Sequence, residues 1–161
     1  MEDDYRAEFA ALMTPMHMVV DNLFLGNLRA AQDDQLLQAH NITCIVQCLQ
    51  DSSMAPAFRF AEYCTVPVAD FEGENIAFLL PKAVRFIHAS RQAGKAVLVH
   101  CAAGVSRSST VVIAYMMATT QRNWEAALEF VRSRRRCVSP NPGFLLQLQQ
   151  LDVAHLRQEI A

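Results

Sequence analysis

The chain has 161 residues, a size typical of one domain, and its 52% hydrophobic and 19% charged content excludes a disordered protein. Its formal net charge of -2 excludes a general attraction to nucleic acid or anionic membranes, so any binding of anions must be local. The acidic start MEDDYRAEF has no apolar core typical of a secretory signal, and the apolar run over residues 111–118 is too short to cross a bilayer.

The first half of the chain alternates short apolar segments with helical ones. In chain order it predicts an N-terminal arm (1–16), a hairpin of strands 18–20 and 23–25, a helix (30–40), a mostly buried strand (42–49), a loop (51–60) and a strand (61–70). The arm is expected to be loosely tied, with a helical turn near residues 5–13. The last of these strands ends at Asp70.

Helices dominate the second half of the chain. In order it predicts a helix (75–94) that starts or kinks at Pro81, a strand (96–100), a very apolar helix (107–120), a helix capped by Asn123 and, after the break SPNPG, an amphipathic helix (144–158). Trp124 and Phe144 are interpreted as core residues. We therefore predict an α/β fold with a central sheet, in a single domain over residues 17–161 that follows the arm.

The cysteines and the chain ends bear on location and cofactors. Five cysteines without a CxxC pair argue against a disulfide framework or a zinc ribbon, and they favour a reduced intracellular setting. We therefore expect a cytoplasmic protein, with entry into the nucleus left open. No spacing of His, Cys and Asp predicts a metal, and no cofactor is expected. Glu2 and the ending RQEIA signal neither myristoylation nor prenylation, so no membrane anchor is expected.

The segment AVLVHCAAGVSRSST (96–110) joins an apolar strand, a short loop and the start of a helix. This arrangement aims backbone N–H groups and the positive end of a helix dipole into one bowl, which suits a phosphate dianion. Gly104 provides the conformational freedom that a tight loop needs, and Arg107 can donate two parallel hydrogen bonds to phosphate. The predicted phosphate-binding residues are Ala102, Ala103, Gly104, Val105, Ser106 and Arg107.

Cys101 is the predicted nucleophile of this loop. A helix N-terminus beside cations favours a thiolate, which can attack phosphorus and form a phosphocysteine. Ser108 can offer a hydroxyl to the sulfur and help it leave when water hydrolyses that intermediate. Alternation along the strand turns His100 to the opposite side, which predicts a structural, hydrogen-bonding role.

Cleavage of a phosphate ester also needs a general acid to protonate the leaving oxygen. Asp70 ends a strand and opens a loop, so it can reach the same pocket. Glu72 and Glu74 compete for the role, although they lie farther along the loop.

Residues 100–109, HCAAGVSRSS, fit the HCxxGxxR[ST] signature of cysteine-dependent protein phosphatases. Four other segments resemble the atypical dual-specificity phosphatases: VDNLFLGN (20–27), AYMM (114–117), NWEAALEFVRSRR (123–135) and PNPGFLLQL (140–148). The resemblance covers most of the chain, from about residue 18 to residue 152. It implies the cysteine-phosphatase fold, with a mixed, mostly parallel sheet flanked by helices.

The resemblance also implies roles for individual residues. Cys101 would be the nucleophile, and Arg107 would hold the phosphate and stabilise the transition state. Asp70, 31 residues before the cysteine, would act as acid and then as base, while Ser108 would assist hydrolysis. Asn141 would tie the last helix to the active-site loops. The implied substrates are proteins phosphorylated on tyrosine and on serine or threonine; the oligomeric state stays open.

Two other functions are kept as alternatives. One is a phosphatase of a non-protein phosphoester, such as a phosphoinositide, an RNA 5′ end or a phosphosugar. Lipid phosphatases of the superfamily carry lysines in the loop, whereas this chain has Ala102, Ala103 and Val105, which disfavours a phosphoinositide. The other is a weakly active phospho-binding scaffold, which would not need the nucleophile Cys101.

Two further features have two interpretations each. Cys48 is most simply a small buried residue. In the lipid-phosphatase relatives, however, a cysteine at the end of the corresponding strand can form a disulfide with the nucleophile, so a protective Cys48–Cys101 bond is the alternative. A basic cluster at a helix end is interpreted either as solvated or as a guide for acidic flanks of a phosphopeptide. The cluster comprises Arg132, Arg134, Arg135 and Arg136.

Overall fold

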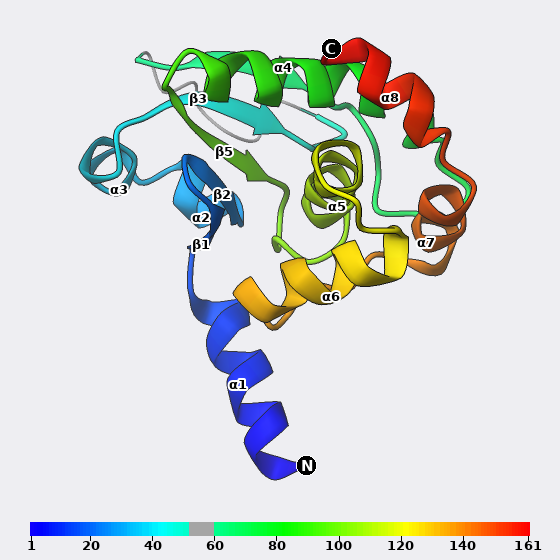
Figure 1. Cartoon of the computed structure of the whole chain (residues 1–161). Helices are drawn as coiled ribbons and strands as arrows, with labels where there is room; N and C mark the ends of the chain where they lie inside the picture. Colours follow the sequence, from blue (N-terminus) through cyan, green and yellow to red (C-terminus); the bar gives the residue numbers. More distant parts are fainter. Residues whose placement is uncertain (52–59) are drawn as a thin grey trace.

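The computed structural model describes residues 1–51 and 60–161, and these residues form a five-stranded sheet in the order β1-β2-β5-β3-β4 (Figure 1). The strands are β1 (Met16–Val20), β2 (Leu23–Gly26), β3 (Ile42–Gln47), β4 (Glu62–Thr65) and β5 (Ala96–His100). The β1–β2 hairpin is antiparallel, and the other pairings are parallel. The prediction of a mixed, mostly parallel sheet in an α/β fold is confirmed.

Strand β5 lies in the middle of the sheet, and all five of its residues are buried. Its last residue, His100, pairs with Gly26 of β2 and with Gln47 of β3. Because these strands are parallel, their carboxyl ends meet at one edge of the sheet. Open α/β sheets bind ligands at that edge, which is where the loop with Cys101 begins.

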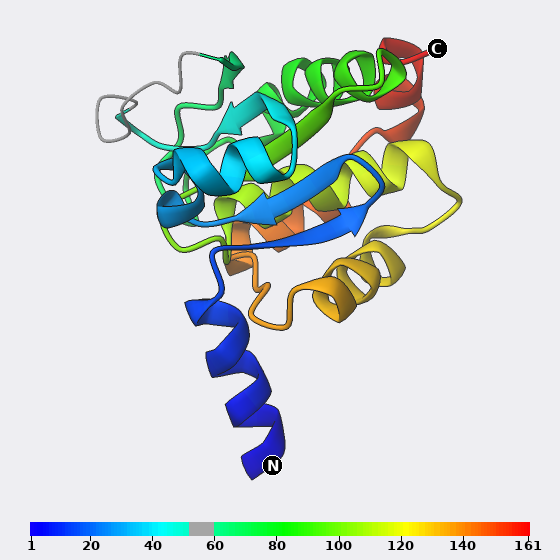
Figure 2. The ribbon, with the colours of Figure 1, turned by 90° about the vertical axis from the view of Figure 1, so that its left-hand side faces the viewer.

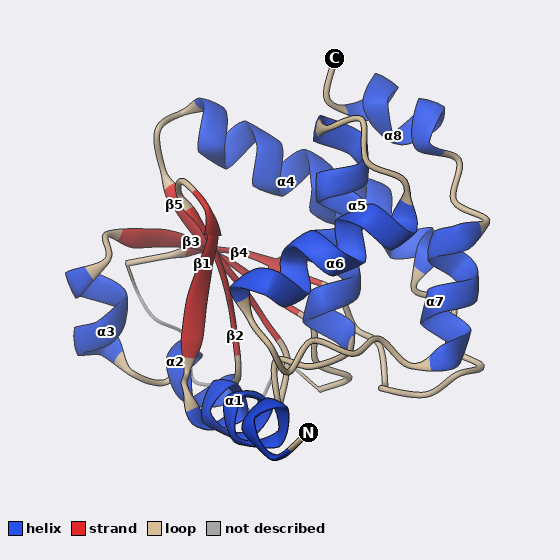
Figure 3. Ribbon diagram, turned by 60° about the horizontal axis from the view of Figure 1, so that its bottom comes forward, coloured by secondary structure: helices blue, strands red, loops and turns tan. Residues whose placement is uncertain are grey.

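Helices cover both faces of the sheet, as the edge-on view in Figure 3 shows. The helical elements are α1 (Glu2–Met13), α2 (Leu28–Ala31), α3 (Asp34–Ala39), the 3-10 turn η2 (Ala77–Leu79), α4 (Leu80–Gln92), α5 (Arg107–Thr119), α6 (Trp124–Arg134), α7 (Pro142–Gln149) and α8 (Val153–Glu159). Side-chain alternation along β5 divides the core between the two faces. Val97 and Val99 pack in the larger cluster with α4 and α5, whereas Leu98 packs in the smaller one with α2 and α3.

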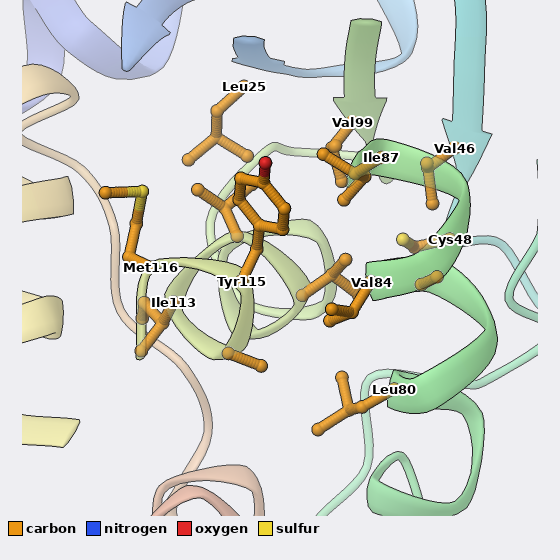
Figure 4. Packing of buried hydrophobic residues seen from close by; sticks show 14 of the residues in the cluster. Leu25, Val46, Cys48, Leu80, Val84, Ile87, Val99, Ile113, Tyr115 and Met116 are labelled. Atoms are coloured by element: carbon orange, nitrogen blue, oxygen red, sulfur yellow. The ribbon is translucent and has the colours of Figure 1, made fainter. Parts of the chain in front are cut away.

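Helix α5 is the central helix of the larger cluster. Its residues from Ser108 to Ala118 are all buried, as expected for a helix that is apolar on every side. Figure 4 shows Tyr115 of this helix among Leu25 of β2, Val99 of β5 and Ile87 of α4. The helix that follows the Cys101 loop is therefore held firmly from its first turn onward.

In the first half of the chain, the predicted helix 30–40 and the predicted strand 61–70 are wrong in extent. The helix expected over residues 30–40 is two short helices, because Asp33 caps α3 by accepting a hydrogen bond from the N–H of Leu36. The strand expected over residues 61–70 ends at Thr65, since Pro67 has no N–H to continue the pairing. The loop expected over residues 51–60 falls mostly on 52–59, outside the described residues.

The closing helix expected over residues 144–158 is also wrong, because the chain breaks between α7 and α8. Asp152 accepts a hydrogen bond from the N–H of His155 and so starts a new helix. The other helix signals are confirmed: Asn123 caps α6, and Pro81 lies in the first turn of α4.

The N-terminal segment contains a full helix, α1, rather than a single turn. This helix projects from the body in both Figure 1 and Figure 2, and it leaves Tyr5 and Phe9 exposed. The division into an arm of residues 1–16 and a domain of residues 17–161 stays a prediction. Within the described parts of the chain, no helix is long and apolar enough to cross a membrane.

Candidate active site

The loop of residues 101–106 connects the end of β5 to the start of α5, so two buried elements hold its ends. Cys101 is the first residue of the loop, and only 2% of it is exposed. Its Sγ lies 3.0 Å from the Oγ of Ser108, in the first turn of α5. The structure therefore brings together the predicted nucleophile and the predicted helper hydroxyl.

The carbonyl groups of this loop are all held by hydrogen-bond donors. Donors and acceptors are His100 Nδ1 to Cys101 O (3.1 Å), Leu28 N to Ala102 O (3.0 Å), Arg135 Nη2 to Ala103 O (3.2 Å), Arg135 Nε to Gly104 O (2.9 Å), Ser139 N to Val105 O (2.9 Å) and Thr110 N to Ser106 O (3.0 Å). In a trans peptide the N–H of the next residue points away from the carbonyl. The N–H groups of residues 102–107 are therefore turned away from these donors, as an anion-binding loop requires.

Gly104 sits at the point where the loop is tightest. Its φ of 69° lies in the left-handed region that glycine adopts without strain. A Cβ at this position would lie 2.6 Å from the carbonyl oxygen of Gly26, and a Cβ on Gly26 would lie 2.5 Å from that of Pro15. Three backbone segments thus touch here without room for a side chain.

Arg107 supplies a charged donor beside this loop. Its Nη1 donates to the carbonyl oxygen of Val68 at 3.2 Å, which anchors the guanidinium to the segment that leads to Asp70. Its Nε is buried and has no hydrogen-bond partner among the described residues. A buried donor without a partner is costly unless a ligand accepts from it. The arrangement suits a phosphate oxygen at this position.

Asn141 connects the predicted acid, Asp70, to the loop of residues 101–106, the predicted phosphate loop. Its backbone N–H donates to Ser106 Oγ at 2.9 Å, and its side-chain Nδ2 donates to Asp70 Oδ1 at 2.9 Å. Its own Oδ1 accepts from the N–H of Phe144 and so caps α7. The residue predicted to tie the last helices to the active-site loops makes such contacts in the structure, and Asp70 stays exposed at the surface.

The competing carboxylates have other surroundings. Glu74 Oε1 accepts a hydrogen bond from the N–H of Ala69 at 3.0 Å, which stabilises the turn of the acid loop. The backbone of Glu72 packs closely against Gly143, where a Cβ would lie 2.1 Å from the Glu72 carbonyl oxygen. The first contact engages the Glu74 carboxylate, whereas the second involves only the main chain of Glu72, and Asp70 remains the predicted general acid.

The family model for the dual specificity phosphatase catalytic domain matches residues 23–153. The chain belongs to the dual-specificity phosphatase family. It is 38% identical to human dual specificity protein phosphatase 22 over 143 residues, 89% of this chain and 77% of the relative. It is 37% identical to the mouse serine/threonine/tyrosine-interacting protein over 161 residues, 96% of this chain and 72% of that protein. The crystal structure of DUSP15 superposes with a TM-score of 0.86 at 34% identity, covering 91% of this chain and 94% of that one.

These comparisons confirm the predicted family and fold, and they show a dual-specificity protein phosphatase. The matched range includes the whole segment from β2 to the start of α8. It therefore contains the Cys101 loop, the acid loop and Asn141.

Arg135 is the residue of this phosphatase that the sequence prediction missed. The basic cluster was expected to be solvated or to face a substrate, and Arg132, Arg134 and Arg136 are indeed exposed. Arg135, by contrast, is fully buried, and it donates to carbonyl groups of the phosphate loop. A signal was present: Ala127 and Val131 are buried on one face of α6, and four residues farther along that face lies Arg135.

Cys48 is buried, as its simpler interpretation requires. It follows β3, and its N–H donates to the carbonyl oxygen of His100 at 2.8 Å, one residue before the nucleophile. Burial, and secondarily the charge of Cys101, raises the pKa of the Cys48 thiol well above its usual range. The disulfide between the two cysteines stays a prediction.

That prediction can be checked with peroxide, which oxidises the Cys101 thiolate to a sulfenic acid; attack by Cys48 then forms the disulfide and releases water. We expect the wild type to regain activity with a reductant, whereas in a Cys48→Ala variant further oxidation of Cys101 to the sulfinic or sulfonic acid makes the loss irreversible. Mass spectrometry should find a linked Cys48–Cys101 peptide. Peroxide treatment that leaves Cys101 only as sulfenic or sulfonic acid would contradict the disulfide.

His100, for which the sequence predicts a structural role, lies behind the Cys101 loop. Its ring is fully buried, and its Nδ1 donates to the carbonyl oxygen of Cys101. Burial lowers the pKa of His100 to about 4, so the ring stays neutral in the folded protein near neutral pH. Protonation would place a charge beside the loop with no solvent to stabilise it.

We therefore expect a pH-dependent stability. Below about pH 6.5 the unfolded chain protonates this histidine and the folded chain does not, so stability is complete above that pH and is lost as pH falls toward 4. The loss is at most about 1.4 kcal/mol per pH unit for this group. Urea unfolding at several pH values should give a free energy of unfolding that changes with pH along a smaller slope in His100→Gln than in the wild type. Equal slopes for wild type and His100→Gln would contradict this role.

Proposed function

We propose that the phosphatase hydrolyses phosphotyrosine and phosphoserine or phosphothreonine in proteins through a phosphocysteine formed on Cys101. The observation that carries the proposal is the loop itself: its carbonyl groups are all turned to donors, and the Arg107 Nε beside it is buried with no partner in the described residues. Such a site stabilises the negative charge that is spread over the three equatorial oxygens of the phosphoryl group in the transition state.

In the first step the thiolate of Cys101 attacks phosphorus, an S–P bond forms and the P–O ester bond breaks. Asp70 gives its proton to the leaving alcohol oxygen, because an alkoxide or phenoxide leaves poorly unprotonated. Arg107 and the backbone N–H groups hold the equatorial oxygens of the phosphoryl group throughout.

In the second step water attacks the phosphocysteine, and Asp70, now a carboxylate, accepts a proton from that water. The S–P bond breaks, and inorganic phosphate leaves with the Cys101 thiolate regenerated. Ser108 Oγ lies 3.0 Å from the sulfur and can donate a hydrogen bond to it as negative charge returns. Asn141 holds Asp70 near the loop during both steps.

A scaffold role is the second candidate. It is favoured by one relative, the mouse serine/threonine/tyrosine-interacting protein, and by a human structure described as tyrosine phosphatase-like, which superposes with a TM-score of 0.82 at 37% identity. The nucleophile and its helper hydroxyl at 3.0 Å support turnover over binding alone. We propose a signalling role in the cytoplasm, with phosphorylated proteins as partners and no nucleic acid.

Substrate class can be decided by one comparative assay. We expect hydrolysis of phosphotyrosine and phosphothreonine peptides to exceed that of phosphoinositides and triphosphate RNA, because Ala102, Ala103 and Val105 bring no charge to the loop.

Loss of the nucleophile should abolish catalysis but not binding. We expect Cys101→Ser to remove measurable hydrolysis of a small aryl phosphate while inorganic phosphate still binds, since the backbone N–H groups and Arg107 remain. Cys137→Ser, a half-buried cysteine outside the loop, serves as the matched control and should keep turnover. Turnover by Cys101→Ser at the wild-type rate would exclude the phosphocysteine mechanism.

Loss of the general acid should slow turnover without abolishing it. We expect Asp70→Asn to lower kcat by about 10²–10⁴-fold, the usual contribution of a general acid, with a smaller effect for aryl phosphates whose leaving groups need no proton. Glu72→Gln is the matched control in the same loop. If Glu72→Gln lost activity and Asp70→Asn did not, the acid would be assigned to the wrong residue.

A further inference from the structure

Arg135 lies just after the end of α6, and its side chain is completely buried. Its guanidinium reaches two different parts of the molecule. On one side Nε donates to Gly104 O at 2.9 Å and Nη2 donates to Ala103 O at 3.2 Å. On the other side Nη1 donates to Thr14 O at 2.8 Å and lies 3.0 Å from His17 Nδ1.

The partners of this buried cation are neutral. The contacts described for it are carbonyl oxygens and an imidazole, and none of the ion pairs of the described residues includes it. Burial lowers the pKa of Arg135. Burial, and secondarily the positive charge of Arg135, also lowers the pKa of His17, which keeps that ring neutral and able to accept. Burying a cation that forms no direct ion pair is costly, so stability alone gives a poor reason for it.

The two loop carbonyls that Arg135 holds determine the directions of two neighbouring N–H groups. Because each peptide is planar and trans, the Ala103 carbonyl fixes the N–H of Gly104 and the Gly104 carbonyl fixes the N–H of Val105. These peptides flank the residue with φ of 69°, the part of the loop with the greatest conformational freedom. The neighbouring carbonyl of Ala102 is held separately, by the N–H of Leu28.

We propose that Arg135 is a positioning residue of the phosphate loop, which holds the Gly104 and Val105 N–H groups toward the phosphoryl group by binding the two carbonyls behind them. This role rests on the proposed function, in which the N–H groups of the loop bind the phosphoryl group. Arg135 lies behind the loop and is positively charged, so it also attracts the phosphate dianion. The neutral groups that donate to the other loop carbonyls add no such attraction.

The test compares three variants of the full chain. Arg135→Lys keeps a charge and a long stem but lacks the planar fork that binds both carbonyls, and Arg135→Met removes all donors. Arg134→Met is the matched control, because Arg134 is an exposed neighbour that stacks on Phe130. Each variant is measured for melting temperature, for kcat and KM on an aryl phosphate, and for inhibition by inorganic phosphate.

A direct readout comes from backbone amide NMR during titration with inorganic phosphate. In the wild type we expect large shifts at the Gly104 and Val105 amides. In Arg135→Lys we expect these two shifts to shrink while the Ala103 amide, whose preceding carbonyl is held by Leu28, still responds. We expect kcat/KM to fall about 10- to 100-fold, less than the roughly 10²–10³-fold loss typical of deleting an oxyanion donor outright. Arg134→Met should match the wild type.

The outcomes separate positioning from simple stabilisation. A folded Arg135→Lys or Arg135→Met variant with wild-type phosphate inhibition and unchanged Gly104 and Val105 shifts would overturn the proposal, even if its melting temperature fell. If neither variant folds, absence of those shifts in the wild type would overturn it and their presence would support it. If the wild type binds phosphate with these shifts but hydrolyses no aryl phosphate, the proposed function fails and the role of Arg135 in the loop stands.

Discussion

The site depends on one constraint: a short loop must turn its N–H groups, and not its carbonyls, toward a dianion. In water, a peptide group whose carbonyl is not held by a donor could turn either its N–H or its carbonyl toward the ligand. Here the donors that hold the carbonyls come from β5, α2, the segment after α6 and the first turn of α5. The loop conformation is therefore a property of the assembled fold, and it requires elements that are far apart in the chain.

The acid is coupled to the same loop through α7. Asn141 contacts Ser106 with its backbone and Asp70 with its side chain, while it also caps α7. One turn farther along, Gln147 donates to the carbonyl oxygen of Glu74 and accepts from the N–H of Ala77. A single short helix thus sets the distance between Asp70, the proposed general acid, and the loop of residues 101–106, the proposed phosphate site.

The sequence predicted the parts of the site that are contiguous or close to a chain signal. Cys101, Arg107 and Ser108 lie in one motif, and Asp70 follows a strand segment, so a local pattern is enough to propose them, and the structure places Ser108 beside Cys101. Arg135 was missed because its role depends on two carbonyls about thirty residues away and on Thr14, which no local pattern reports. The helix breaks before Asp34 and after Gln149 were missed for a local reason. The apolar periodicity continues across each break, but a single capping side chain starts a new helix there.

The contact among Pro15, Gly26 and Gly104 has a consequence for how this protein can change over evolution. Each of the two glycines lies against the main chain of another segment, so no substitution can be absorbed by a new rotamer of a neighbour. Ala102 and Ala103, by contrast, are exposed, and larger side chains can be accommodated there. Substitutions at such exposed positions of the loop can therefore alter substrate preference. Gly26 and Gly104 cannot be replaced, because the neighbouring main chain leaves no room for a side chain, whatever the reaction requires.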